Sequence, residues 1–279
     1  MRMRRFCRNR NGEEEKMKHK GIGILTVSFL AVIAAAFCAY AEIGPGYSLQ
    51  KANEALQTGT AGTDAADKIS DETKGETVQV NTLDEKAALL KTSKTAKLTD
   101  QIILVTDHDL ALFDRQADGT WKAALETYCG YGRNGLKAAE KRQEGDGTTP
   151  IGAFPILHAF GQTDNPGTAM TWKKITKDSY WSGEESTYNT WVESKNKIEG
   201  EHLIDYQICY KYAMAIGFNT DPAVYKRGSA IFLHIKNPAT WSSAGCVSVE
   251  EAYMLQLLKQ CHNGAYIMIV PDTASIAAY

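Results

Sequence analysis

The sequence predicts a mainly β domain, a sheet or a sandwich, with one helix that follows a Ser-Ala-Gly-Cys segment. Strand-like runs of five to nine residues recur after residue 100, and turn-forming residues such as Asp118 and Gly119 interrupt them. No ten-residue helical pattern lies between the first three runs. Only residues 249–261 combine a helical spacing of apolar residues with acidic side chains in the first turn. We therefore expect a folded domain over residues 98–273, which is large enough for one core.

The expected strands form a hairpin-rich opening and a later group. Their limits are residues 101–106, 111–115, 121–128, 210–218, 230–234 and 265–270. A turn at residues 117–119 joins the second strand to the third. The stretch over residues 130–155 is rich in glycine and is expected to be a loop. It lacks the Gly-Lys-Ser/Thr ending of a P-loop and does not follow the Rossmann pattern, so nucleotide binding is not expected.

The helix over residues 249–261 is expected to pack behind the turn that carries Cys246. Its apolar stripe consists of Ala252, Leu255, Leu258 and Cys261, and Asn263-Gly264 ends it. Because the helix would begin just after Cys246, we expect its N-terminus to lower the pKa of the thiol.

The chain before residue 98 is expected to lie outside the globular domain. Residues 1–20 are basic, and residues 21–41 form an uncharged apolar run, which is long enough for a bilayer that requires about 20 residues. The basic flank should stay in the cytoplasm and the rest of the chain should lie outside it. Two alternatives stay open: a retained transmembrane anchor, or a signal peptide cleaved after residues 39–41 (Ala-Tyr-Ala). Residues 42–97 are polar and are expected to be a flexible linker.

Charge and cysteine content exclude several function classes. Residues 1–41 hold eight of the 31 basic and three of the 33 acidic side chains, so the remainder carries a net charge of about −7. That balance argues against nucleic acid as a partner, because phosphate binding requires a basic surface. No Cys-x-x-Cys or His-Glu-x-x-His spacing exists, so we expect neither a metal nor a cofactor. If Cys246 is a free thiol, at most one disulfide can form among Cys129, Cys209 and Cys261.

Cys246 and His234 are the pair of side chains that indicates chemistry. An imidazole can take the proton of a thiol, and the thiolate can attack a carbonyl carbon. Gly245 would let a substrate carbonyl approach the backbone, where the amides of Gly245 and Cys246 could hold a developing oxyanion. Ser243 could hydrogen-bond near the site or cap the following helix. A cysteine and a histidine are often simply buried, so the pair alone is a weak signal.

Three segments, in this order, resemble the YkuD-type L,D-transpeptidase family. They are residues 144–154 (EGDGTTPIGAF), His234, and residues 243–246 (SAGC). The resemblance runs from about residue 102 to residue 270. Residues 180–191 and 228–234 look like a clostridial-type branch of the family.

The resemblance implies an extracytoplasmic enzyme that acts on peptidoglycan stem peptides. Family members attack the carbonyl of the third residue of a stem tetrapeptide, expel the terminal D-alanine and hold the acyl group as a thioester. An amine of a second stem then accepts the acyl group, which gives a 3→3 cross-link. By this resemblance Cys246 is the nucleophile and His234 is the base, and the main-chain carbonyl of a residue such as Ile235 orients the imidazole.

Other functions stay open beside this one. Water as the acceptor would make the protein an L,D-carboxypeptidase, and a non-catalytic module that binds the cell wall is a further alternative. A sortase would need a longer gap between His and Cys and an Arg after the Cys. A papain-like endopeptidase would have its Cys before its His.

Two positions depart from the common Ser-His-Gly-Cys-x-Arg motif of the family. Ala244 stands in place of the His, and Ser248 stands in place of the Arg. Another cation must then bind a substrate carboxylate, and the candidates are Arg227, Lys236, Arg133 and Arg142. Trp181 is a candidate for substrate binding, although core packing explains such aromatic residues at least as often.

Overall fold

The computed structural model describes residues 82–279, so the expected basic segment, the apolar segment and most of the expected linker lie outside the described residues. Within residues 82–279 no helix is long and apolar enough to cross a membrane. This part of the chain is mainly β with few helices, which confirms the predicted class.

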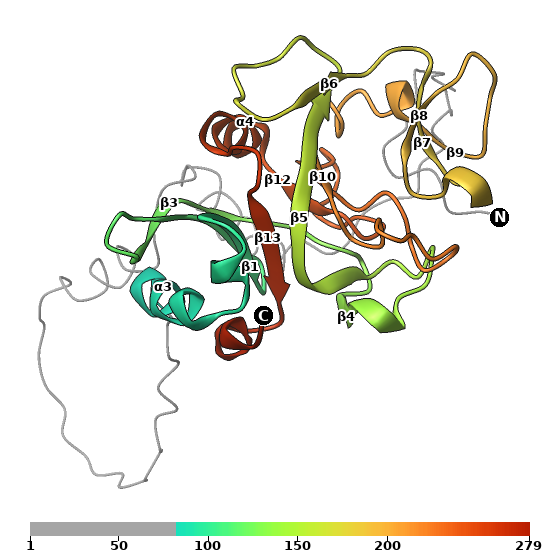
Figure 1. Ribbon diagram of the computed structural model, residues 1–279. Helices are drawn as coiled ribbons and strands as arrows, with labels where there is room; N and C mark the ends of the chain where they lie inside the picture. Colours follow the sequence, from blue (N-terminus) through green and yellow to red (C-terminus); the bar gives the residue numbers. More distant parts are fainter. Residues whose placement is uncertain (1–81) are drawn as a thin grey trace, which may run out of the picture. The chain divides into compact units, whose positions relative to one another are not determined.

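The strands form one ten-stranded sheet and one three-stranded sheet (Figure 1). The strands are β1 Gln101–Thr106, β2 Asp109–Arg115, β3 Trp121–Tyr128, β4 Leu136–Ala138, β5 Thr149–Gly161, β6 Trp172–Lys174, β7 Ser179–Ser182, β8 Trp191–Glu193, β9 Gly200–His202, β10 Tyr212–Ile216, β11 Phe232–Ile235, β12 Val247–Val249 and β13 Tyr266–Val270. The α-helices are α3 Leu83–Thr92 and α4 Glu251–Gln260. Short 3-10 helices are η1 Thr95–Lys97, η2 Ala139–Lys141, η3 Glu185–Thr187, η4 Leu203–Asp205 and η5 Thr273–Ala278.

The large sheet has the strand order β12-β11-β10-β5-β13-β1-β2-β3, and β4 and β6 also pair with β5. The long strand β5 joins the two parts of this sheet. Its first half pairs with β13 through Gly152 to Pro155, and its second half pairs with β10 from Ile156 onward. Figure 1 shows β5 running between β13 and β10. The glycine-rich segment, expected to be a loop, is therefore partly a central strand.

The core lies on both faces of the large sheet because side chains alternate along each strand. Ile267 and Ile269 of β13 point into one apolar cluster, which also holds α4, whereas Met268 of the same strand points into the cluster that holds α3. A third cluster surrounds Phe160 and Phe232 and lies beside the three-stranded sheet. These clusters fix the positions of β11, which contains His234, and of β12, which directly follows Cys246.

Helix α4 packs against the sheet with a face that agrees only in part with the expected one, since Leu258 and Cys261 of the predicted stripe are buried. Met254, Leu257 and Leu258 are fully buried, whereas Ala252 of the predicted stripe is exposed. The spacing of Met254, Leu257 and Leu258 is also helical, so the sequence permits either face and the packing selects this one. Val249, the expected first residue of the helix, is the last residue of β12.

Helix α3 extends the folded part of the chain into the segment expected to be a linker. Thr82 caps its N-terminus by accepting a hydrogen bond from the amide of Glu85 over 3.2 Å. Leu90 of this helix is fully buried in the same cluster as Phe113 and Ile276, the latter from η5. Residues that precede and residues that follow the expected domain of residues 98–273 therefore contribute to one core.

Candidate functional site

Strands β11 and β12 bring Cys246 and His234 to one face of the sheet. The two strands are parallel, and Leu233 pairs with Val247 and His234 with Ser248. Leu233 and Val247 point into the cluster that holds α4. Because neighbouring residues of a strand point to opposite faces, His234 and Cys246 point to the other face, where Cys246 packs with Phe232.

The thiol of Cys246 is held by the backbone of the segment that leads into β11. Its Sγ donates to the carbonyl oxygen of Ala230 over 3.2 Å and accepts from the amide of Phe232 over 3.3 Å. Only 7% of the residue is exposed. Burial raises the pKa of the thiol to about 12, because the charged thiolate is poorly solvated there.

The imidazole of His234 is oriented by a main-chain carbonyl, as the family resemblance implies. Its Nδ1 lies 2.8 Å from the carbonyl oxygen of Ile235. Since a carbonyl only accepts, Nδ1 carries the proton and Nε2 is the basic nitrogen. Burial lowers the pKa of His234 to about 4, so the ring is neutral near pH 7.

Ser243 and Gly245 shape the turn before Cys246. The Ser243 hydroxyl donates to the carbonyl oxygen of Cys246 over 2.6 Å and accepts from the amide of Gly245 over 3.0 Å. Gly245 has a φ of 145°, and a Cβ atom there would lie 2.8 Å from the carbonyl oxygen of Thr148. The Gly245 amide, expected as an oxyanion donor, is thus already bonded within the turn, and the amide of Cys246 is the remaining candidate.

The expectation that a helix N-terminus lowers the pKa of Cys246 is wrong. Cys246 is followed by strand β12, and α4 begins only at Glu251. Ser243 therefore does not cap a helix either, and it instead closes the turn that carries the thiol.

Cys246 and His234 line one cavity of about 180 Å³. Trp181 from the three-stranded sheet lines it too, as do Ser243 and Arg142, so the structure brings these predicted site residues together. Trp181 is 3% exposed, and its ring packs edge-on against Phe232 with centroids 4.8 Å apart. The tryptophan thus belongs to the core and to the cavity wall.

Sequence reasoning missed two residues of this cavity, Tyr210 and Glu201. The Tyr210 ring meets His234 edge-on with centroids 5.6 Å apart, and its hydroxyl donates to the carboxylate of Glu201 over 2.7 Å. Both line the cavity. No sequence motif marks them, because β9 and the segment before β10 approach the site only through the tertiary fold.

Two predicted binding residues lie away from the cavity. Arg227 is exposed and does not line it. Lys236 lies 3.5 Å from the carboxylate of Glu250 and its ammonium group stands over the ring of Trp241. A role for either in substrate binding stays a prediction.

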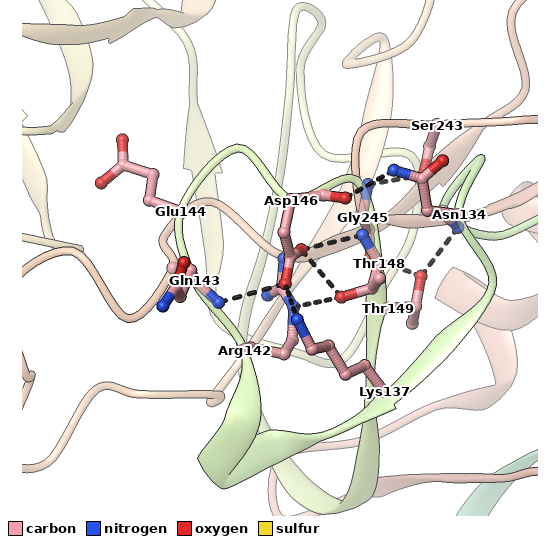
Figure 2. Close-up of polar contacts among 12 residues, drawn as sticks. Asn134, Lys137, Arg142, Gln143, Glu144, Asp146, Thr148, Thr149, Ser243 and Gly245 are labelled. Atoms are coloured by element: carbon pink, nitrogen blue, oxygen red, sulfur yellow. Dashed lines mark hydrogen bonds and ion pairs between the residues drawn. The ribbon is translucent and has the colours of Figure 1, made fainter.

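Arg142 is a cavity residue and belongs to a polar network that is centred on the carboxylate of Asp146 (Figure 2). Its Nη2 lies 3.2 Å from Oδ1 of Asp146, and its Nε donates to the hydroxyl of Thr148 over 3.1 Å. Partial burial of Asp146 opposes ionisation, but hydrogen bonds from Thr148 and Gln143 outweigh it and hold the pKa of that carboxyl below its usual range. Asp146 therefore shapes the glycine-rich turn.

The described residues contain no group of three or more His, Cys, Asp or Glu side chains that could hold a metal ion. Cys129 and Cys261 are both free and buried, so neither of them forms a disulfide with Cys209.

Comparison with protein families matches the model of the YkuD L,D-transpeptidase catalytic domain to residues 101–270. Comparison with curated proteins finds no match.

Several solved structures are similar to this chain. Bd1075 of Bdellovibrio bacteriovorus has 19% identity and a TM-score of 0.36, over 64% of this chain and 51% of that one. The helical cell shape determining protein Pgp2 of Campylobacter jejuni has 13% identity and a TM-score of 0.36, over 69% and 59%. A mutant of an L,D-transpeptidase from Enterococcus faecium has 15% identity and a TM-score of 0.30, over 62% and 49%. The chain thus spans about half to three fifths of the length of these proteins.

Proposed function

This chain belongs to the YkuD family of L,D-transpeptidase catalytic domains, and on that premise we propose that it is a cysteine-dependent L,D-transpeptidase of peptidoglycan. The observation that carries the proposal is the cavity that Cys246 and His234 line together. The bond from Nδ1 of His234 to the carbonyl of Ile235 supports it further, because it leaves Nε2 as the proton acceptor.

In the first half-reaction the thiol of Cys246 attacks the carbonyl carbon of the third residue of a stem tetrapeptide. Nε2 of His234 takes the thiol proton as the carbon–sulfur bond forms, and it returns that proton to the departing amine of the terminal D-alanine. The carbon–nitrogen bond breaks and a thioester remains on Cys246. The amide of Cys246 is the candidate donor to the oxyanion that forms in between.

In the second half-reaction an amine of another stem peptide attacks the thioester. The amine loses a proton to His234, the carbon–sulfur bond breaks, and the thiol of Cys246 is restored. The product is a 3→3 cross-link. If water takes the place of the amine, the product is a tripeptide, and the protein is an L,D-carboxypeptidase.

The resting pair is uncharged near neutral pH. Burial holds the pKa of Cys246 at about 12 and that of His234 at about 4, so the thiol and the neutral imidazole predominate. Attack therefore requires proton transfer from Sγ to Nε2 during the approach of the carbonyl, which a neutral imidazole can perform.

The test is to incubate the full-length protein with a disaccharide-tetrapeptide and to follow the products by mass spectrometry. We expect a cross-linked dimer, released D-alanine and an acyl adduct on Cys246. Cys246→Ala should give none of these, and His234→Gln should slow them by roughly two orders of magnitude or more. Tripeptide without dimer would support the carboxypeptidase instead. Absence of every product and adduct would leave the wall-binding module, whose binding Cys246→Ala would not change.

We further propose that the protein acts outside the cytoplasm, attached to the membrane or secreted to the cell wall. Peptidoglycan, the proposed substrate, lies there, and the apolar run at residues 21–41 supports either an anchor or a signal peptide. N-terminal sequencing of the exported protein distinguishes them, because only cleavage yields a chain that begins near residue 42.

A further inference from the structure

Arg142 is a buried cation beside the proposed nucleophile. The residue is 4% exposed, although arginine side chains are mostly exposed and rarely fully buried unless they are paired. Its Nε and Nη2 are bonded to Thr148 and Asp146, and its guanidinium lies over the ring of Phe218, 5.1 Å from the centroid. Its Nη1 is buried and has no hydrogen-bond partner among the described residues.

The network around Arg142 has more positive than negative charge. The carboxylate of Asp146 pairs with Arg142 over 3.2 Å and also with Lys137 over 3.2 Å (Figure 2). Two cations therefore share one carboxylate. Because Arg142 is buried and Lys137 is partly exposed, the uncompensated charge is least screened on the side of Arg142.

The turn that carries Cys246 lies directly against this guanidinium. A Cβ atom on Gly245 would lie 3.2 Å from Nη2 of Arg142. The carbonyl oxygen of Gly245 accepts a hydrogen bond from Thr149 over 2.7 Å, which ties the turn to the same strand end as Thr148. Of the described residues that line the cavity, Arg142 is the only lysine or arginine. Ser248, which stands where the common motif has Arg, is neutral and donates to the carbonyl oxygen of Trp241.

We propose that Arg142 is a positioning residue that stabilises the thiolate of Cys246 through the positive charge of its buried guanidinium. The proposal rests on Cys246 being the nucleophile of the proposed reaction. A thiolate that forms at Sγ of Cys246 lacks the hydration that it would have in water, which raises its free energy. The positive charge of a fixed cation nearby offsets part of that cost.

The other charged and titratable groups at the cavity do not replace this cation. The carboxylate of Glu201 acts in the opposite direction and disfavours the thiolate. Glu144 accepts a hydrogen bond from Tyr188 over 2.7 Å and is also acidic. Tyr210 and His234 are neutral near pH 7, since burial raises the pKa of the former and lowers that of the latter. The charge of Arg142 lowers the pKa of Cys246, although the effect of burial is larger.

The test measures the thiol in the free enzyme, without substrate. The full-length protein is treated with iodoacetamide, which is neutral, between pH 6 and 10, and modification of Cys246 is followed by peptide mass mapping. Arg142→Gln should slow alkylation about tenfold at each pH below the thiol pKa, which corresponds to an increase of about one pKa unit. Arg142→Lys keeps the charge and should restore most of the rate. Arg115→Gln, which removes an exposed arginine from the end of β2, should match the wild type.

Iodoacetate gives a second readout, because it is an anion that the same cation attracts. The ratio of the iodoacetate rate to the iodoacetamide rate should fall in Arg142→Gln and recover in Arg142→Lys. Circular dichroism of each variant checks that the fold is kept, and the lysine variant tests the proposal even if the glutamine variant is unstable.

Two outcomes would overturn the proposal. One is an Arg142→Gln variant that is folded and alkylates with the wild-type pH profile. The other is an increased KM for the stem peptide with an unchanged thiol profile, which would mean that Arg142 binds a substrate carboxylate. Failure of the proposed function is separate: it would appear as loss of cross-linked product in the wild type, whereas the alkylation profile does not depend on that product.

Discussion

Gly245 connects the sequence motif to the position of Cys246. Its φ of 145° is available to glycine and strained for other residues, and the carbonyl oxygen of Thr148 occupies the space that a side chain would need. Its amide and its carbonyl are both bonded, to Ser243 and Thr149. The motif glycine therefore serves the geometry of the turn.

We expect Gly245→Ala to abolish most of the activity and to destabilise the fold by roughly 2–4 kcal/mol, because strain and a backbone clash act together. Gly264→Ala is the matched control: Gly264 has a φ of 93° but open space around it, so only the strain applies. Thermal unfolding and the cross-linking assay measure both variants. Equal losses of stability in the two would show that the contact with Thr148 has no effect.

Within single elements, sequence reasoning succeeded for regular strands and failed where glycine and proline interrupt the pattern. Strands β1 and β3 have the predicted limits, and β10, β11 and β13 lie within one or two residues of them. Strand β5 was missed because Pro150, Gly152 and Pro155 are residues that strands disfavour. Pairing with β10 and β13 stabilises β5 nonetheless. A local stretch of sequence does not reveal these long-range pairings.

Helix α3 is a second element that local sequence patterns do not predict. Its composition is typical of a linker, and its stability depends on burying Leu90 against residues from distant parts of the chain. The polar composition of residues 42–97 predicts a linker, and only the packing makes this helix part of the domain.

We expect Leu90→Ala to lower the free energy of unfolding by about 2–5 kcal/mol, because it leaves a cavity in a closed core. Leu98→Ala is the matched control, since Leu98 is 63% exposed and the same atoms are removed from the surface. Urea unfolding of both variants measures the difference. Similar midpoints would mean that α3 does not stabilise the domain.

For the molecule as a whole, burial of two histidines makes stability depend on pH. His158 and His234 are both buried, and burial lowers the pKa of each to about 4. In the unfolded chain both titrate near 6.5. As pH falls from about 6.5 to 4, the unfolded state binds protons that the folded state does not, so the free energy of unfolding decreases.

We expect a loss of about 1–3 kcal/mol per histidine across that range, measured by thermal unfolding at a series of pH values. His158→Gln should flatten the dependence between pH 6.5 and 4 without removing His234 from the site. Stability that is constant over this range in the wild type would contradict the burial of neutral imidazoles. The carboxyl of Asp146 titrates below this window, because its pKa lies under the usual value near 4.

By itself the sequence determined the family and the mainly β class, and it singled out Cys246 and His234 as candidates, because these depend on residue identity and order along the chain. The tertiary structure decided what surrounds the thiol. Parallel pairing of β11 with β12 sets Cys246 before a strand and not at a helix N-terminus, and it buries the thiol so that its pKa rises. The fold also brings Arg142 from the glycine-rich turn against Gly245. Long-range pairing and desolvation produce these effects, and neither is encoded in a local motif.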